Sequence, residues 1–166
     1  LVGSEMCIRD RSDIIIAGPP CQGFSITGPR NIDDPRNKLY LSVFKTLKLT
    51  NPKAFVVENV RGLKTMWEGN VFKEIIKKFE SAGYIVTESL LNSADYGVPQ
   101  IRHRVFIVGI KKELDKKFEF PKPEFDKDNY ITCGEAIDNL PSLENGELKS
   151  NDYNEKPTTN YQRYVM

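Results

Sequence analysis

The chain has 166 residues, which is enough for about one domain of ordinary size. Hydrophobic residues make up 39% and charged residues 28%, so the composition supports a buried core and argues against intrinsic disorder. The net charge of +1 neither indicates nor excludes a nucleic-acid partner, because a basic cleft can be balanced by acidic residues elsewhere.

The cysteines and the apolar runs exclude several classes of protein. Cys7, Cys21 and Cys133 are far apart and form no C-x-x-C pair, and the sequence has one histidine. We therefore expect no metal site, and we expect a reducing compartment without structural disulfides. No apolar run approaches the roughly 18 residues that a membrane-spanning helix requires, and no secretory signal is visible. The sequence thus predicts no membrane partner.

Residues 1–12 differ from the rest of the chain, because they show no periodicity before a strand pattern begins abruptly at Asp13. We interpret them as a leader that is not native to the gene and exclude them from the fold. A poorly ordered natural terminus is the alternative.

Strand and helix patterns alternate along the next 130 residues or so. The predicted strands are residues 13–17, which we expect to be a fully buried strand of a parallel sheet, and residues 54–57, 84–91 and 105–110. The predicted helices are residues 39–47, with Asn37 as the candidate N-cap and a stop at residues 50–52, residues 70–82, and a short one at residues 132–140. This order indicates an α/β sheet with right-handed crossovers. Residues 142–159 are polar and resemble a linker.

The first candidate for chemistry is Cys21, in the segment Pro-Pro-Cys-Gln-Gly-Phe-Ser that follows the first predicted strand. Ligands of open α/β sheets bind beyond the carboxyl ends of the strands, so a cysteine here lies where reactive groups usually lie. The two prolines stiffen the turn, and Gly23 lets the backbone approach a flat ligand closely. The alternative is a buried, inert cysteine.

Two further segments carry polar groups of the right kind. Glu58 and Asn59 end the second predicted strand, where a carboxylate and an amide can bind the edge of a planar ring; a loop-fixing pair is the alternative. Alternation would place Gln100, Arg102 and Arg104 on one side of an extended segment. Two guanidinium groups there suit a phosphate, a carboxylate or a base edge, and a solvated charged edge is the alternative.

Together, and in this order, the three segments resemble the DNA cytosine-5 methyltransferase family over about residues 13–141. The Cys21 segment is similar to the family's catalytic loop, Glu58-Asn59-Val60 to its glutamate motif, and Gln100-x-Arg102-x-Arg104 to its QxRxR motif. The segment from Asp34 to Tyr40 resembles the one that opens the helix between the first two motifs.

The resemblance implies a Rossmann-like, S-adenosylmethionine-dependent methyltransferase sheet that is truncated at its N-terminal strands. The family's glycine-rich cofactor loop, its target-recognition region and its final segment have no counterpart in this sequence. We therefore expect residues 13–141 to be the second half of a catalytic domain and residues 142–166 to lead into the absent recognition region. We expect the chain alone to be inactive.

The resemblance also assigns roles to single residues. Cys21 would be the nucleophile that adds to carbon 6 of cytosine, and Glu58 would protonate ring nitrogen N3. Arg104 would contact the cytosine carbonyl oxygen, and Arg102 would stabilise the covalent adduct. The residues expected to position the substrate are Gln22, Ser25, Asn59 and Gln100, and those expected near S-adenosylmethionine are Pro20 and Leu39.

The implied partner is double-stranded DNA with a cytosine flipped out of the helix, and the parent enzyme is expected to be monomeric. It would be cytoplasmic in a prokaryote or phage and nuclear in a eukaryote.

An RNA cytosine-5 methyltransferase is the first alternative, although the Gly-Phe-Ser ending at residues 23–25 favours DNA. A catalytically dead nucleic-acid-binding relative and an unrelated α/β domain that uses Cys21 for thiol chemistry are the others. The target sequence, and the choice between restriction-modification, phage and epigenetic roles, stay open.

Overall fold

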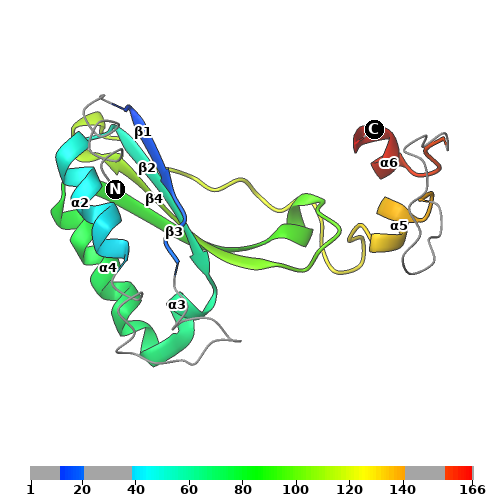
Figure 1. Ribbon diagram of the computed structural model, residues 1–166, viewed down its shortest axis with the longest axis horizontal. Coiled ribbons are helices and arrows are strands. Elements are labelled where there is room, and N and C mark those ends of the chain that lie inside the picture. The colour runs from blue at the N-terminus through cyan, green and yellow to red at the C-terminus, as the bar shows by residue number, and fades with distance from the viewer. Residues whose placement is uncertain (1–11, 21–38, 141–155, 166) are drawn as a thin grey trace, which may run out of the picture. The chain divides into compact units, whose positions relative to one another are not determined.

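The computed structural model describes residues 12–20, 39–140 and 156–165. These residues form two compact units (Figure 1). The first, here called the sheet unit, contains the described residues up to Leu91 together with His103–Pro121. The second, the loop unit, contains Asn92–Arg102 together with the residues from Lys122 onward. Within the described residues, no helix combines the length and apolar character needed to cross a bilayer.

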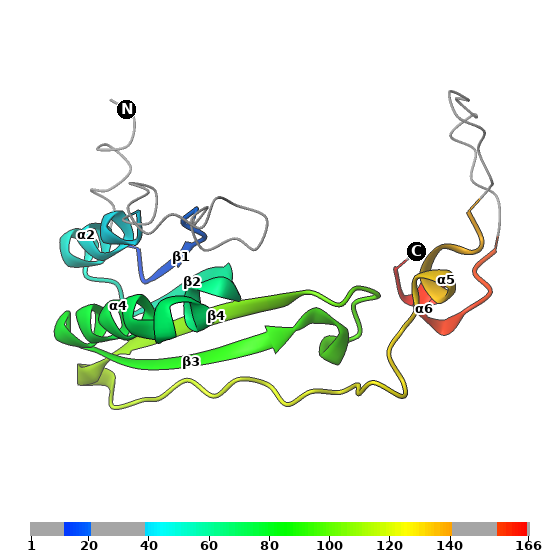
Figure 2. The same ribbon diagram turned by 90° about the horizontal axis from the view of Figure 1, so that it is seen from below.

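The sheet has the order β1-β2-β4-β3, with β1 at Ile14–Ala17, β2 at Ala54–Val60, β3 at Tyr84–Asn92 and β4 at His103–Lys111. Strands β1 and β2 are parallel, whereas β2 and β4 are antiparallel. In Figure 2, β3 and β4 also run in opposite directions. The predicted α/β sheet is confirmed, but it is mixed rather than parallel. The reason is the length of the segment that connects β3 to β4. A short connection suits antiparallel strands, whereas a parallel pair needs a longer crossover.

Two helices cover one face of this sheet (Figure 2). They are α2 at Tyr40–Thr50 and α4 at Asn70–Ser81, and the short α3 at Gly62–Thr65 and the 3-10 turn η3 at Met66–Gly69 lie between β2 and α4. Leu47 of α2 and Ile75 and Phe79 of α4 pack against the inward side chains of β2 and β4. Each such side chain contributes about 1.5–3 kcal/mol by leaving water, so this apolar stripe holds the sheet unit together.

The structure tests the predicted end of α2 but not its predicted N-cap. Asn51, in the left-handed conformation, ends the helix and donates its N–H to Leu47 O, which confirms the predicted stop. The cap position at the start is Leu39, whose side chain has no polar atom. Asn37, the predicted N-cap, lies outside the described residues. Leu39 itself has helical backbone angles (φ −66°, ψ −20°), so the expectation that Asn37 caps this helix stays a prediction.

The centre of the core is the fully buried ring of Phe55. Its centroid lies 4.7 Å from that of Phe79 and 5.0 Å from that of Tyr84. Gly109 is opposite Phe55 in the β2–β4 pairing, and a β-carbon on this glycine would stand 2.1 Å from the ring. Only a glycine at residue 109 therefore leaves room for the ring that joins the helices to the sheet.

The other face of the sheet carries Ile14 and Ile16, which are 60% and 80% exposed. The prediction that residues 13–17 form a fully buried strand was therefore wrong. Successive side chains of a strand point to opposite faces, so Ile15 and Ala17 pack toward the core while their neighbours face away from α2 and α4. An unbroken apolar run predicted burial on both faces, and the described elements bury one.

The loop unit begins with the 3-10 turn η4 at Ser93–Tyr96 and also contains α5 at Cys133–Ile137 and α6 at Asn160–Val165. Thr132 and Glu135 form a reciprocal capping box at the start of α5, and these hydrogen bonds lower the pKa of Glu135. The helix is shorter than the predicted residues 132–140. Thr159, just before α6, donates its hydroxyl to Glu135 O at 2.7 Å, which fastens α6 to α5.

Candidate active site at the carboxyl end of β2

A salt bridge joins Glu58 to Arg104 near the carboxyl end of β2. The Arg104 Nε–Glu58 Oε1 distance is 2.8 Å. The antiparallel register pairs Val60 with Arg104 and Glu58 with Phe106, which places Glu58 and Arg104 as diagonal neighbours on one face of the sheet. Their side chains are 38% and 24% exposed, so solvent screens the attraction. The pair therefore fixes orientation more than it adds stability.

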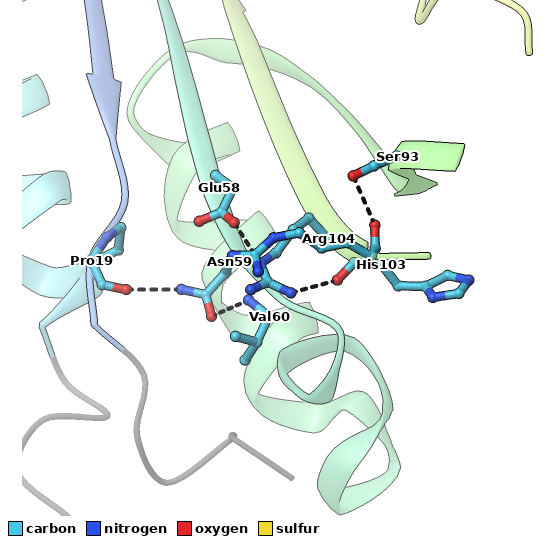
Figure 3. A network of polar contacts seen from close by, with 8 residues as sticks. Pro19, Glu58, Asn59, Val60, Ser93, His103 and Arg104 are labelled. Atoms are coloured by element: carbon cyan, nitrogen blue, oxygen red, sulfur yellow. Dashed lines mark hydrogen bonds and ion pairs between the residues drawn. The ribbon is translucent and has the colours of Figure 1, made fainter. Parts of the chain in front are cut away.

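Both ends of this pair have a second neighbour. Arg104 Nη1 donates to the carbonyl oxygen of His103 at 2.9 Å, so two contacts hold the guanidinium group (Figure 3). The second carboxylate oxygen of Glu58, Oε2, lies 3.8 Å from where a β-carbon on Gly18 would be. Glu58 therefore faces the segment that follows β1 and leads to Cys21.

Asn59 makes a direct link to the same segment. Its Nδ2 donates to the carbonyl oxygen of Pro19 at 3.1 Å, and its Oδ1 accepts the N–H of Val60 at 2.8 Å (Figure 3). The side chain is 4% exposed, so it is a buried polar group that has partners at both ends of its amide. This bond ties the end of β2 to the backbone two residues before Cys21.

The structure describes some of the other predicted site residues but not all of them. Cys21, Gln22 and Ser25 lie outside the described residues. Pro20 follows β1 and is exposed, and Leu39 stands half-buried at the start of α2. Both are apolar side chains that a ligand could contact.

Gln100 and Arg102 belong to the loop unit, whereas Arg104 belongs to the sheet unit. The N–H of Gln100 donates to Val98 O at 2.7 Å, and β4 begins only at His103. A bend at residues 99–100 thus interrupts the extended segment at Gln100, whereas the expectation that Arg102 and Arg104 share one side stays a prediction. Glu58 also lies inside β2 rather than at its end, since the strand continues to Val60.

Sequence reasoning selected Glu58 and Arg104 but missed that they are paired, because their contact depends on the register between β2 and β4. It also missed Asn92, Asp95 and Tyr130, which form a hydrogen-bonded group in the loop unit. The available signal was weak: Asn92 directly follows the third predicted strand, residues 84–91. The described residues contain no group of His, Cys, Asp and Glu suited to hold a metal ion.

Comparison with known proteins shows the family of the chain. Residues 4–165 match the family of C-5 cytosine-specific DNA methylases, a wider span than the resemblance at residues 13–141. The type II methyltransferase M.BspRI of Lysinibacillus sphaericus is 43% identical over 146 residues, which cover 86% of this chain and 34% of that protein. The type II methyltransferase M.BsuRI of Bacillus subtilis is 48% identical over 113 residues, or 68% of this chain and 26% of that one.

A solved structure is similar as well. It is a candidate DNA modification methyltransferase encoded within a prophage (E. coli), which has a TM-score of 0.65 and 29% identity over 86% of this chain and 39% of its own. The chain thus spans about a third of the length of these relatives. Because the family match covers nearly all of its residues, the chain belongs to the C-5 cytosine-specific DNA methylase family.

Proposed function

We propose that the protein carrying this chain is a DNA cytosine-5 methyltransferase that acts on a flipped cytosine through a covalent adduct with Cys21. The observation that carries the proposal is the arrangement at the end of β2. There the Glu58–Arg104 salt bridge and the Asn59–Pro19 hydrogen bond adjoin the segment that leads to Cys21. A carboxylate, a guanidinium group and a cysteine loop are the groups that this chemistry requires.

The reaction needs a nucleophile because carbon 5 of cytosine, within an aromatic ring, attacks a methyl group poorly. Addition of the Cys21 thiolate to carbon 6 breaks the aromaticity and makes carbon 5 enamine-like. Carbon 5 then takes the methyl group, a base removes the carbon 5 proton, and the electron pair of that C–H bond expels the thiolate. A free thiol has a pKa of about 8.5, so the loop must lower that pKa or align the attack.

Protonated Glu58 would deliver its proton to ring nitrogen N3 as the thiolate adds, which draws negative charge out of the ring. The salt bridge holds Oε1 beside Arg104, while Oε2 faces Gly18, which is three residues before Cys21 in the sequence. A guanidinium group has five N–H groups, and the contacts of Arg104 with Glu58 and with the carbonyl oxygen of His103 use two of them. Arg104 could therefore also donate to the carbonyl oxygen of the cytosine. Arg102 would stabilise the adduct, and Gln22, Ser25, Asn59 and Gln100 would position the substrate.

S-adenosylmethionine would supply the methyl group, and the electron pair of the broken sulfur–methyl bond would stay on sulfur as the neutral thioether S-adenosylhomocysteine. Pro20 and Leu39 would contact it, which fits their accessible apolar side chains at the end of β1 and the start of α2.

The partner would be double-stranded DNA, from which the target base must be extruded at a cost of a few kcal/mol. The two relatives are named type II methyltransferases, which favours a restriction-modification role in the bacterial cytoplasm. We further propose that residues 13–141 are the second half of the catalytic domain, in a monomeric enzyme, and that the chain alone is inactive.

Trapping on modified DNA tests this proposal. Fluorine at carbon 5 cannot leave as a proton does, so a methylated adduct on 5-fluorocytosine stays attached to its cysteine. The full-length protein should form this adduct in the presence of S-adenosylmethionine, and Cys21→Ala and Cys21→Ser should abolish it. Cys133→Ser is the matched control, because Cys133 is exposed and its thiol donates to Pro99 O. Adduct formation that persists in both Cys21 variants would overturn the proposal.

A further inference from the structure

Asn92, the last residue of β3, is a buried side chain whose amide is bonded at both ends. Its Oδ1 accepts the backbone N–H of Arg102 at 3.1 Å. Its Nδ2 donates to Asp95 Oδ1 at 3.0 Å and to the hydroxyl of Tyr130 at 3.2 Å. At 8% exposure, this side chain gains little from water, so these three bonds fix the direction in which its carbonyl oxygen points.

The next residue holds the other polar group of the same peptide segment. Ser93 donates its N–H to Arg102 O at 3.0 Å and its hydroxyl to the same oxygen at 3.2 Å. Two consecutive residues thus bind both the N–H and the carbonyl oxygen of Arg102, whose side chain is exposed. The backbone is fixed while the guanidinium group remains accessible to a ligand.

Asp95 and Tyr130 hold the side-chain amide of Asn92, which in turn binds the backbone of Arg102. The Tyr130 hydroxyl donates to Asp95 Oδ1 at 2.5 Å, and this bond is the main reason that the pKa of Tyr130 is raised. The N–H groups of Glu124 and Phe125 both donate to Asp95 O, at 2.9 and 3.1 Å. We call Asn92, Ser93, Asp95 and Tyr130 the Arg102 clamp. All four lie in the loop unit, so their contacts are internal to one compact unit.

We propose that Asn92 is a positioning residue for methyl transfer, which acts by holding the backbone of Arg102. The inference rests on the proposed function, in which Arg102 stabilises the covalent adduct. Asn92 would not touch the substrate. Its oriented carbonyl oxygen sets the place of the Arg102 backbone, and a guanidinium group that must meet a reacting base loses much of its effect if its root shifts by about 1 Å. Tyr130 and Asp95 keep the Asn92 amide from turning over.

The first test is local and uses hydrogen exchange of the full-length protein, resolved to the Arg102 amide. Asn92→Ala removes the acceptor of this amide, so its exchange should accelerate by about fivefold or more, while that of Ile107 in β4 stays unchanged. Tyr130→Phe removes one partner of the Asn92 amide and should give a smaller change in the same direction. Unchanged exchange at Arg102 in both variants would overturn the inference.

The second test is a double-mutant cycle on steady-state methylation. Asn92→Ala should lower kcat by about tenfold or more and change the KM for S-adenosylmethionine by less than about twofold. In an Arg102→Ala background it should have no further effect, because the residue through which it acts is gone. Tyr130→Phe should show the same pattern with a smaller loss. Tyr84→Phe is the control, because it removes a buried bond, from Tyr84 Oη to Pro52 O at 2.9 Å, in the sheet unit.

The outcomes separate the inference from the function on which it rests. If Asn92→Ala slows the Arg102→Ala enzyme as much as the wild type, Asn92 acts elsewhere and the inference fails. If Asn92→Ala leaves kcat unchanged while the Cys21 variants are dead, the inference alone fails. If the Cys21 variants still form the adduct, the proposed function fails, and the inference fails with it.

Discussion

Arg102 and Arg104 are two residues apart in the sequence, yet different parts of the molecule position them. Arg104 lies in β4, where the antiparallel register with β2 brings it to Glu58. Arg102 lies in the loop before that strand, where Asn92 and Ser93 bind its backbone. The first arginine depends on the packing of a sheet, and the second depends on the hydrogen bonds of the Arg102 clamp. Neighbouring residues can thus respond to entirely different substitutions.

The two arginines also differ in how strongly the surrounding structure holds them in place. Strand β2 is anchored by Phe55 and Val57, which pack under α2 and α4, so a shift of its register would expose a large apolar surface. The Arg102 clamp contains no comparable apolar anchor among its four residues, and its bonds are worth about 1 kcal/mol each. We therefore expect the Glu58–Arg104 pair to tolerate local changes that displace Arg102.

The largest effect should come from Gly109→Ala, which disturbs the packing of the sheet unit. The added β-carbon would stand 2.1 Å from the Phe55 ring, so the ring or the β2–β4 pairing must move. We expect a loss of about 3 kcal/mol in the free energy of unfolding, measured by urea denaturation of the full-length protein. Phe55→Leu in the same chain should recover part of this loss by making room. A Gly109→Ala protein with wild-type stability would show that the register is not held by this contact.

The same comparison explains how far the sequence could predict the molecule. Periodicity located α4 and the strands well, because apolar side chains at fixed spacing must face a core. It failed for Ile14 and Ile16, since a run of apolar residues does not say how many faces of a strand are covered. It selected Glu58 and Arg104 by residue type but could not pair them, because register is a property of two strands.

The clamp was missed for a different reason. Asn92, Asp95 and Tyr130 are ordinary polar residues in turn-rich segments, and 35 residues separate the last two. Such contacts are set by the path of the chain after β4, which carries no periodic pattern. The role of Cys21 was inferred from motif resemblance and stays a prediction, as do the roles of the other site residues.

A smaller effect should follow from high pH, through Tyr84 at the start of β3. Burial, and then the negative charge of Glu113, raise the pKa of this phenol from 10.0 to about 12. Because the folded state keeps the proton longer than the unfolded state, this contribution to stability is complete below pH 10 and is lost as the pH rises through 12. The denaturation midpoint should therefore decline across this window.

Tyr84→Phe should lower stability at pH 8 by about 1 kcal/mol and should flatten the decline above pH 10. The ring, and the Lys111 ammonium group 4.6 Å above its centroid, are retained, so the comparison isolates the phenol. Tyr164→Phe is the matched control, since Tyr164 is 89% exposed. An equally steep decline in the Tyr84→Phe protein would refute this account of the sheet unit.

The claim that the Glu58–Arg104 pair works as one unit on the target base is tested most directly by single-turnover methyl transfer. Glu58→Gln and Arg104→Gln should each slow the step by at least about a hundredfold while DNA binding survives. The double variant should be no more than about twofold slower than the slower single variant, because the two side chains act together. Glu88→Gln, which breaks the 2.6 Å salt bridge to Lys64 in the same unit, should leave the rate unchanged. Losses that multiply in the double variant, or a Glu58→Gln enzyme of wild-type rate, would contradict the account.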